Sequence, residues 1–244
     1  MKLIEAVWEK RNLGVSCLEI VIEKKDEVGD VLSAISERSE EYMVAKVPSG
    51  RTDILLGLQT KGFQFIETLF EIKAKVSEEP QLPEMCKRFI KDISYHFADK
   101  NEIEEVIDHI SEGTVFSTDR IALDPHFSPK IAGIRYGNWI RDVMAQEGSK
   151  LIITELYGKR VGFVVMQKKN GYYDPFLSGL FAEYLDSGYG FVNPYCSQKC
   201  LYELGAKKSV SHISSNNYKI LNIDLMFGSQ ISAITYVLVK HSED

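Results

Sequence analysis

Two glycines stand two residues apart, directly before a segment whose apolar residues have helical spacing. They are Gly188 and Gly190, in the stretch LFAEYLDSGYGFVNPYCSQKC, and a helix is expected over about 191–204. Glycine lets backbone N–H groups approach a ligand closely, and the amino end of a helix carries about half a positive charge. The pattern therefore predicts a site for an anion such as a pyrophosphate at the start of this helix.

Two common nucleotide-binding patterns do not fit this stretch. A dinucleotide fingerprint requires a third glycine where the chain has Asn193, and a phosphate loop requires Gly-Lys-Ser or Gly-Lys-Thr, which the sequence lacks. Paired glycines also occur in ordinary surface loops, so a plain turn is the alternative interpretation.

The glycine pair and its flanks resemble the GNAT superfamily of acyl-CoA N-acyltransferases, whose loop commonly reads Q/R-x-x-G-x-G/A. The resemblance implies acetyl-CoA as the cofactor. It implies that backbone in a bulge of the preceding strand, at Leu180 and Phe181, contacts the pantetheine arm. It also implies that the loop that follows holds the pyrophosphate, through Leu185, Asp186, Ser187, Gly188, Tyr189, Gly190 and Phe191.

A second feature of the same superfamily is an asparagine followed by a small or apolar residue at +3, usually a tyrosine at +7, and a glycine at +11. The chain has Asn217, Ile220, Asp224 and Gly228 at these positions. On a helix the first three share one face, so they are expected to face the same cleft, with Asn217 on the cofactor side. The chain departs from the pattern twice: Leu185 replaces Gln or Arg, and Asp224 replaces the tyrosine acid.

Acyl transfer from a thioester needs a neutral amine, a donor at the developing oxyanion and a proton for the thiolate that leaves. Asp224 is the candidate catalytic residue. We expect it to orient the incoming ammonium or to receive its proton, because an ionised carboxylate would repel a thiolate. A protonated Asp224 acting as an acid, or a plain solvated carboxylate, are the alternatives.

Other reactive side chains favour structural interpretations. Cys196 and Cys200 are four apart on the expected helix, but no further ligand has metal-site spacing, so buried thiols and no metal site are predicted. His212 is expected to be partly buried in a strand, and Glu155 to face the surface.

The coarse pattern is that of an α/β protein with a mixed central sheet of the GNAT type, preceded by a partial copy of the same α/β unit. We expect an amino-terminal unit at 1–76, a linker at 77–83 and a catalytic unit at 84–244. Helices are expected near 84–98, 101–112, 128–147, 191–204 and 217–227. The strands near 175–183 and 208–214 should run parallel and separate at the glycine loop, because a helix connects them.

The suggestion of a copy comes from a weak internal repeat. Residues 54–73 match residues 219–240 when Gly62 is set on Gly228, so that helix, glycine and strand coincide. The front of the chain, through Trp8–Gly14, Tyr42–Pro48 and Lys61–Phe63, also resembles the TDP-fucosamine acetyltransferase group of the superfamily. That group implies the amino group of a nucleotide-linked sugar as acceptor.

Composition sets broad limits on the function. The 244 residues carry a net charge of -6 without a basic stripe, which argues against nucleic acid as the main partner. The first residues lack the apolar run of a signal peptide, so a cytoplasmic protein without membrane segments is expected. A small-molecule amine is the expected substrate. The alternatives are a degenerate relative that binds CoA or a protein without turnover, and a module that forms a homodimer through its amino-terminal unit.

Overall fold

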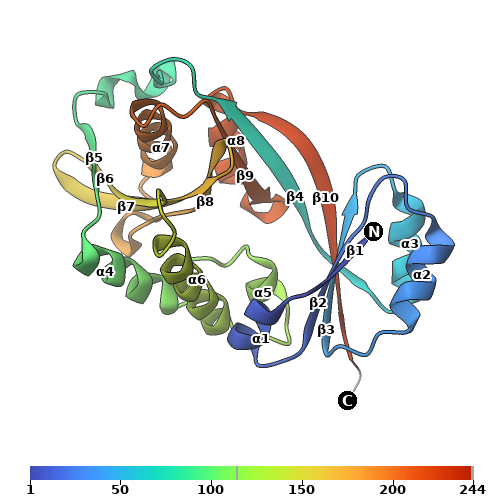
Figure 1. Cartoon of the computed structure of the whole chain (residues 1–244). Coiled ribbons are helices and arrows are strands. Elements are labelled where there is room, and N and C mark those ends of the chain that lie inside the picture. The colour runs from blue at the N-terminus through green and yellow to red at the C-terminus, as the bar shows by residue number, and fades with distance from the viewer. Residues whose placement is uncertain (114, 243–244) are drawn as a thin grey trace.

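Strands from both ends of the chain join in one mixed sheet in the computed structural model, which describes residues 1–113 and 115–242 (Figure 1). The strands of the described residues are β1 (Lys2–Glu5), β2 (Cys17–Val21), β3 (Tyr42–Pro48), β4 (Gln64–Lys75), β5 (Ile93–Phe97), β6 (Lys150–Leu156), β7 (Lys159–Lys169), β8 (Tyr172–Leu180), β9 (Lys208–Ser214) and β10 (Gln230–His241). Their order is β1-β2-β3-β10-β4-β9-β8-β7-β6-β5. Two neighbouring pairs, β2–β3 and β8–β9, are parallel, and the other pairs are antiparallel.

The α-helices are α1 (Val7–Leu13), α2 (Val28–Ser36), α3 (Thr52–Thr60), α4 (Lys100–Ser111), α5 (Arg120–Leu123), α6 (Pro129–Met144), α7 (Val192–Glu203) and α8 (Tyr218–Met226). Short 3-10 turns are η1 (Glu84–Phe89), η2 (Ala182–Tyr184), η3 (Tyr189–Phe191) and η4 (Ser215–Asn217). Among the described residues, no helix combines the length and the apolar character that a bilayer span requires.

The helices cover both faces of the sheet because its central strands alternate buried side chains between the faces. Ile152 and Val164 pack with α7, whereas Leu151 and Phe163 pack with α4 and α6 on the opposite face. In the amino-terminal half, α2 and α3 cover one face (Figure 1). The other face of that half packs against α5 and α6. Helix α6 therefore contacts both halves of the sheet.

The predicted parallel pair is confirmed. Strands β8 and β9 are neighbours and parallel, and they share a single pair of partners, Tyr173 and Ser209. Beyond that pair the two strands separate, in the direction of the glycine loop that follows β8. The mixed α/β sheet is confirmed with it.

The helix expected near 84–98 is wrong. Residues 84–89 form the short turn η1, and residues 93–97 form β5, which pairs antiparallel with β6. The segment ISYHF is rich in β-branched and aromatic residues, which favour a strand. Pairing with the exposed edge of β6 supplies the backbone hydrogen bonds that a helix would otherwise supply locally. Strand β1 and helix α1 were not predicted.

Two helix–glycine–strand units have matching lengths. Helix α3, Gly62 and β4 correspond to α8, Gly228 and β10, with nine residues in each helix and twelve in each strand. Both glycines have positive φ, 85° and 83°, as the helix-ending role predicts. In the sheet, β10 lies between β3 and β4, and β4 lies between β10 and β9, so the two long strands cross the centre together (Figure 1).

Candidate functional site

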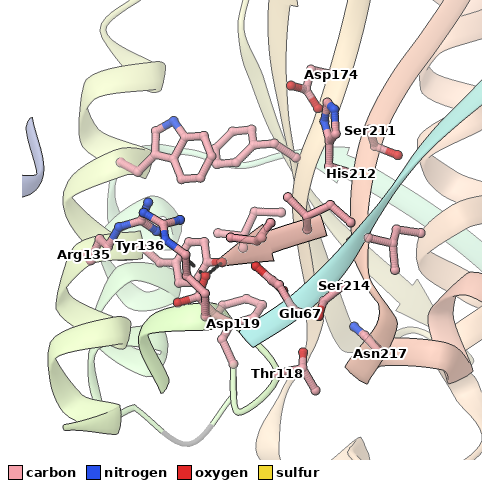
Figure 2. Close-up of a pocket in the computed structure, with 18 of the residues that line it drawn as sticks. Glu67, Thr118, Asp119, Arg135, Tyr136, Asp174, Ser211, His212, Ser214 and Asn217 are labelled. Carbon is pink, nitrogen blue, oxygen red and sulfur yellow. Dashed lines mark hydrogen bonds and ion pairs between the residues drawn. The ribbon is translucent and has the colours of Figure 1, made fainter. Parts of the chain in front are cut away.

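A pocket of about 710 Å³ lies on the α6 side of the sheet, where α1, α6, β4, β8 and β9 meet (Figure 2). Its wall on α6 includes Tyr136 and Trp139, and the Trp139 ring stacks on Phe176 of β8 at 4.4 Å between centroids. Its opposite wall is the separated part of β8 and β9. The pocket therefore combines aromatic surface with the open edge of two parallel strands.

A smaller pocket of about 50 Å³ lies between α7 and the sheet. Its α7 wall is made by Asn193, Pro194, Ser197 and Gln198. Five residues line both pockets: Pro175, Ser178, Ser211, Ile220 and Asp224. Because α6 and α7 cover opposite faces of the sheet, the shared residues lie where the two pockets adjoin, at the opening left where β8 and β9 separate.

Asp224 stands at that opening. Asn217, Ile220 and Asp224 all line the large pocket, as expected for one helical face, and Ile220 and Asp224 also line the small one. Within the described residues the Asp224 carboxyl has no hydrogen bond and no ion pair. Burial raises its pKa to about 7. A carboxyl with that pKa can hold or give up a proton near neutral pH.

The glycine loop lies at the amino end of α7, outside the walls of both pockets. Gly188 has φ 79°, and a side chain placed there would meet no atom within 4 Å. The Tyr189 amide is used by Ser187 Oγ at 3.1 Å, whereas the described structure gives the amides of Asp186 and Gly188 no acceptor. No side chain caps η3 or α7. The loop can therefore offer N–H groups to an anion in open space, which fits a pyrophosphate.

Buried polar contacts fix the first turn of α7 over the sheet. The Asn193 side chain accepts a hydrogen bond from Thr154 Oγ1 at 2.6 Å and donates one to the carbonyl of Gly179 at 3.0 Å. Gly162 makes room for this contact, because a Cβ there would lie 2.7 Å from Asn193 Oδ1 and 2.6 Å from the Gly179 oxygen. Asn193, which excluded the dinucleotide fingerprint, is thus the residue that positions the predicted anion site.

The prediction of a bulge at Leu180 and Phe181 is wrong. Leu180 is in register with Gly162, and the Phe181 amide donates to the Val161 carbonyl at 3.0 Å, so this amide is not available to a ligand. The register shift between β7 and β8 falls instead at Pro175–Phe176, beside the opening. Proline has no N–H to pair with, which favours an irregularity at that position.

A buried ion cluster joins α1 to α6 at the wall of the large pocket. Glu9 is 1% exposed and accepts hydrogen bonds from Arg135 Nε and Nη2, both at 2.7 Å, and from Arg120 Nη2 at 2.5 Å. Burial alone would raise the pKa of Glu9, but the two guanidinium groups lower it to about 2. The carboxylate is therefore ionised at neutral pH and, together with Asp119 at 4.0 Å from Arg135, balances the charge of the two arginines.

Sequence reasoning missed three carboxyl groups of the large pocket, Glu67, Asp119 and Asp174 (Figure 2). Glu67 is 4% exposed, and burial raises its pKa. Burial also raises the pKa of Asp174 to about 6, and its Oδ1 has no hydrogen-bond partner. Asp119 accepts from the Tyr136 hydroxyl at 2.8 Å. An acid at an inward position of a strand, as in FIETLF and YYDPF, was the available signal.

Several structural expectations are confirmed and one is wrong. The four cysteines are buried thiols, and burial raises the pKa of Cys196 to about 12. Glu155 lies outside both pockets and accepts from Ser94 Oγ at 2.6 Å. His212 is more exposed than expected and lines the large pocket, because β9 has no helix over it on that side. Leu185 is exposed.

Asp124, His126 and His241 form a separate cluster whose ligand atoms lie within 4.8 Å of one another. Asp124 Oδ1 is 3.0 Å from His126 Nδ1, and Oδ2 is 2.8 Å from His241 Nε2. The imidazole rings stack at 3.7 Å with 18° between their planes. Each nitrogen lone pair lies in the plane of its own ring, so in two nearly parallel, stacked rings the lone pairs do not meet at one metal ion. The arrangement therefore acts as a hydrogen-bonded tie between the end of β10 and the α5–α6 connection.

Known proteins resemble this chain in structure, whereas comparisons of sequence find no relative. A scan against family models finds no match, and neither does a search of curated proteins. A GCN5-related N-acetyltransferase of Sphaerobacter thermophilus superposes with a TM-score of 0.66 at 10% identity, over 100% of this chain and 76% of the other. A GCN5-related N-acetyltransferase of Kribbella flavida gives 0.55 at 12% identity, over 92% and 81%.

A tandem GNAT protein from the clavulanic acid biosynthesis pathway gives a TM-score of 0.53 at 7% identity, over 94% of this chain and 78% of that protein. At identities of 7–12%, these three superpositions establish the fold alone. The chain therefore has the GNAT-type fold.

Proposed function

We propose that this protein transfers an acetyl group from acetyl-CoA to a primary amine. One observation carries the proposal: two pockets on opposite faces of the sheet adjoin at the opening between β8 and β9, and the carboxyl of Asp224 lines both. Such an opening lets a long cofactor enter from one face while its acceptor enters from the other.

The residues of the small pocket and the glycine loop fit the cofactor. The amides of Asp186 and Gly188 lie in open space at an uncapped helix start and suit a pyrophosphate. The small pocket beside α7 is lined by polar side chains such as Asn193, Ser197 and Ser211, which suit the amides of a pantetheine arm, and its volume of about 50 Å³ matches a part of that arm. When bound, acetyl-CoA would supply the acetyl group as an activated thioester. Leu185 offers no polar side chain to the phosphates, so this protein would hold them through backbone amides.

Asp224 acts on the amine in this account. An ammonium ion must lose a proton before its nitrogen can attack, and the ionised carboxylate at the opening can take that proton. The neutral nitrogen then attacks the thioester carbonyl. As the new nitrogen–carbon bond forms and the carbon–sulfur bond breaks, the nitrogen loses its second proton and the departing sulfur gains one, so CoA would leave as the thiol and Asp224 would release its own proton to solvent. The raised pKa of Asp224 makes it a stronger base than an ordinary aspartate.

The amino-terminal unit is, in our proposal, a partial copy of the carboxy-terminal one. The matching lengths of α3–Gly62–β4 and α8–Gly228–β10 support it, as does the sheet order. In that order each unit's last strand lies beside the other unit, β10 against β3 and β4 against β9. The exchanged strands would explain why a residue of the first unit, Glu9, reaches the pocket of the second.

The alternative is a degenerate relative that binds CoA without turnover. Leu185 and Asp224, which depart from the usual motif, support it. Both readings predict CoA binding, so turnover separates them.

The test is release of CoA thiol from acetyl-CoA, measured with a panel of amines that includes nucleotide-linked amino sugars. The proposal predicts release that depends on both protein and amine, with the acetylated amine detected by mass spectrometry. CoA binding without release for any amine would favour the degenerate relative.

A further inference from the structure

The cationic side chains of the large pocket are all neutralised by carboxylates of the protein. Each has an ion-pair partner, as follows: Arg11 with Asp142, Lys46 with Glu19, Arg120 with Glu9, and Arg135 with both Glu9 and Asp119. Within the described residues, each of these four cations therefore has a carboxylate counter-charge, and Arg120 Nε has no hydrogen-bond partner.

Three carboxyl groups of the same pocket lie in no ion pair of the described structure. They are Glu67, Asp174 and Asp224. Glu67 is more than nine-tenths buried; burial raises its pKa, and Ser214 and Arg120 oppose that rise. Asp174 has an oxygen without any hydrogen-bond partner. A buried carboxyl outside any ion pair costs free energy when it is ionised, and a ligand cation would offset that cost.

The unpaired carboxyl groups lie at separate places in the pocket. Figure 2 shows Asp174 apart from Glu67, which lies toward Asp119 and Tyr136. Asp224 lies at the opening where transfer is proposed. The stacked rings of Trp139 and Phe176 also line the pocket, and aromatic surface is compatible with both an alkyl chain and a cation.

We infer that the acceptor carries a second positive charge: a linear diamine or polyamine whose reacting amine lies at Asp224 and whose other ammonium group pairs with Glu67. The inference rests on the proposed function, and it narrows the acceptor to a cationic class. An acceptor bearing a diphosphate would instead place negative charge beside unpaired carboxyl groups.

A substrate series tests this directly, because compounds of similar length differ at the distal end only. Putrescine, butylamine and γ-aminobutyrate present an ammonium, a methyl group and a carboxylate, and cadaverine and spermidine extend the cationic series. We expect kcat/KM for the best cationic acceptor to exceed that of butylamine about tenfold, which is about 1.4 kcal/mol, and γ-aminobutyrate to be the poorest. Equal or better turnover of γ-aminobutyrate or a nucleotide-linked amino sugar would overturn the inference.

Glu67→Gln assigns the effect to the named side chain. It should lower kcat/KM for the cationic acceptor about tenfold more than for butylamine. The matched control is Glu104→Gln, because Glu104 pairs with Arg141 at 2.8 Å and neither residue lines the pocket. The control should keep the wild-type ratio. A Glu67→Gln protein that keeps the full diamine preference would contradict the assignment, and the wild-type series decides the substrate class even if this variant does not fold.

The cationic pocket can be tested by binding even if the proposed acetyl transfer is not observed. If no amine is acetylated, calorimetry of spermidine and butylamine with the CoA-saturated protein decides the inference alone. Tighter binding of spermidine by about tenfold supports the cationic pocket, and equal binding refutes it.

Discussion

Asp224 is the residue on which the proposed chemistry depends. Burial raises its pKa to about 7, so it is mostly neutral at pH 6 and mostly ionised at pH 8. If it receives the proton of the amine, kcat/KM should rise with pH through about 7, in addition to any rise due to the amine itself. Asp224→Asn should keep CoA affinity, lose this inflection and lower kcat by about tenfold to a hundredfold.

A pH profile of both proteins distinguishes the roles. A fall in wild-type activity through pH 7 would mean that the neutral carboxyl is the active form, acting as an acid. Identical profiles of the two proteins would remove Asp224 from the mechanism.

Glu9 matters for stability because it pairs with two buried arginines. Glu9→Gln leaves Asp119, at 4.0 Å from Arg135, as the only paired carboxylate for both guanidinium groups among the described residues, and it should lower the free energy of unfolding by about 3–5 kcal/mol, measured with urea. The matched control is Glu104→Gln, which breaks the exposed ion pair between Glu104 of α4 and Arg141 of α6. It should lower the free energy of unfolding by less than about 1 kcal/mol. Equal losses in the two variants would contradict the buried role.

The pKa of Glu9 also sets where this stability disappears. It falls from 4.5 to about 2 on folding, so the carboxylate binds fewer protons in the folded state. Its contribution is present above about pH 4.5 and is lost as the pH falls toward 2.

At the scale of elements, the glycine loop and α7 form the proposed pyrophosphate site. Gly188→Val puts a side chain into open space at a left-handed φ, and it should weaken CoA binding by more than about tenfold. Gly205→Val is the matched control, because Gly205 also has positive φ and no neighbour within 4 Å, at the other end of α7. Both variants carry the same backbone strain, so normal CoA affinity in Gly188→Val would place the cofactor elsewhere.

Elements near the glycine loop were predictable because their signals are local. The ends of α3, α7 and α8 carry glycines with positive φ, and a helix between β8 and β9 requires them to be parallel. Strand β5 was missed because its conformation depends on pairing with β6, whose partner residues lie 55 (Phe97–Ile152) to 63 (Ile93–Leu156) positions further along the chain. The pocket carboxyls were missed for the same reason: Glu67 and Asp174 line one pocket only when β4 and β8 take their places in the sheet.

At the scale of the whole molecule, the sheet argues against independent folding of the carboxy-terminal segment. Without residues 1–76, β10 would lose both neighbours, β3 and β4, and Arg135 would lose Glu9. We expect residues 84–244 alone to be unfolded or aggregated, as judged by circular dichroism and light scattering, and to recover when the 1–83 segment is co-expressed. Cooperative unfolding of a monomeric 84–244 segment would show instead that the predicted boundary at 77–83 separates independent units.

The central claim is that the acetyl group reaches its acceptor through the opening between β8 and β9. A crystal structure of the protein with acetyl-CoA tests it most directly. The account predicts the pyrophosphate at the amides of Asp186 and Gly188, the pantetheine arm beside α7, and the thioester at the opening next to Asp224. A cofactor bound elsewhere, or one whose acetyl group lies away from Asp224 and the large pocket, would contradict it.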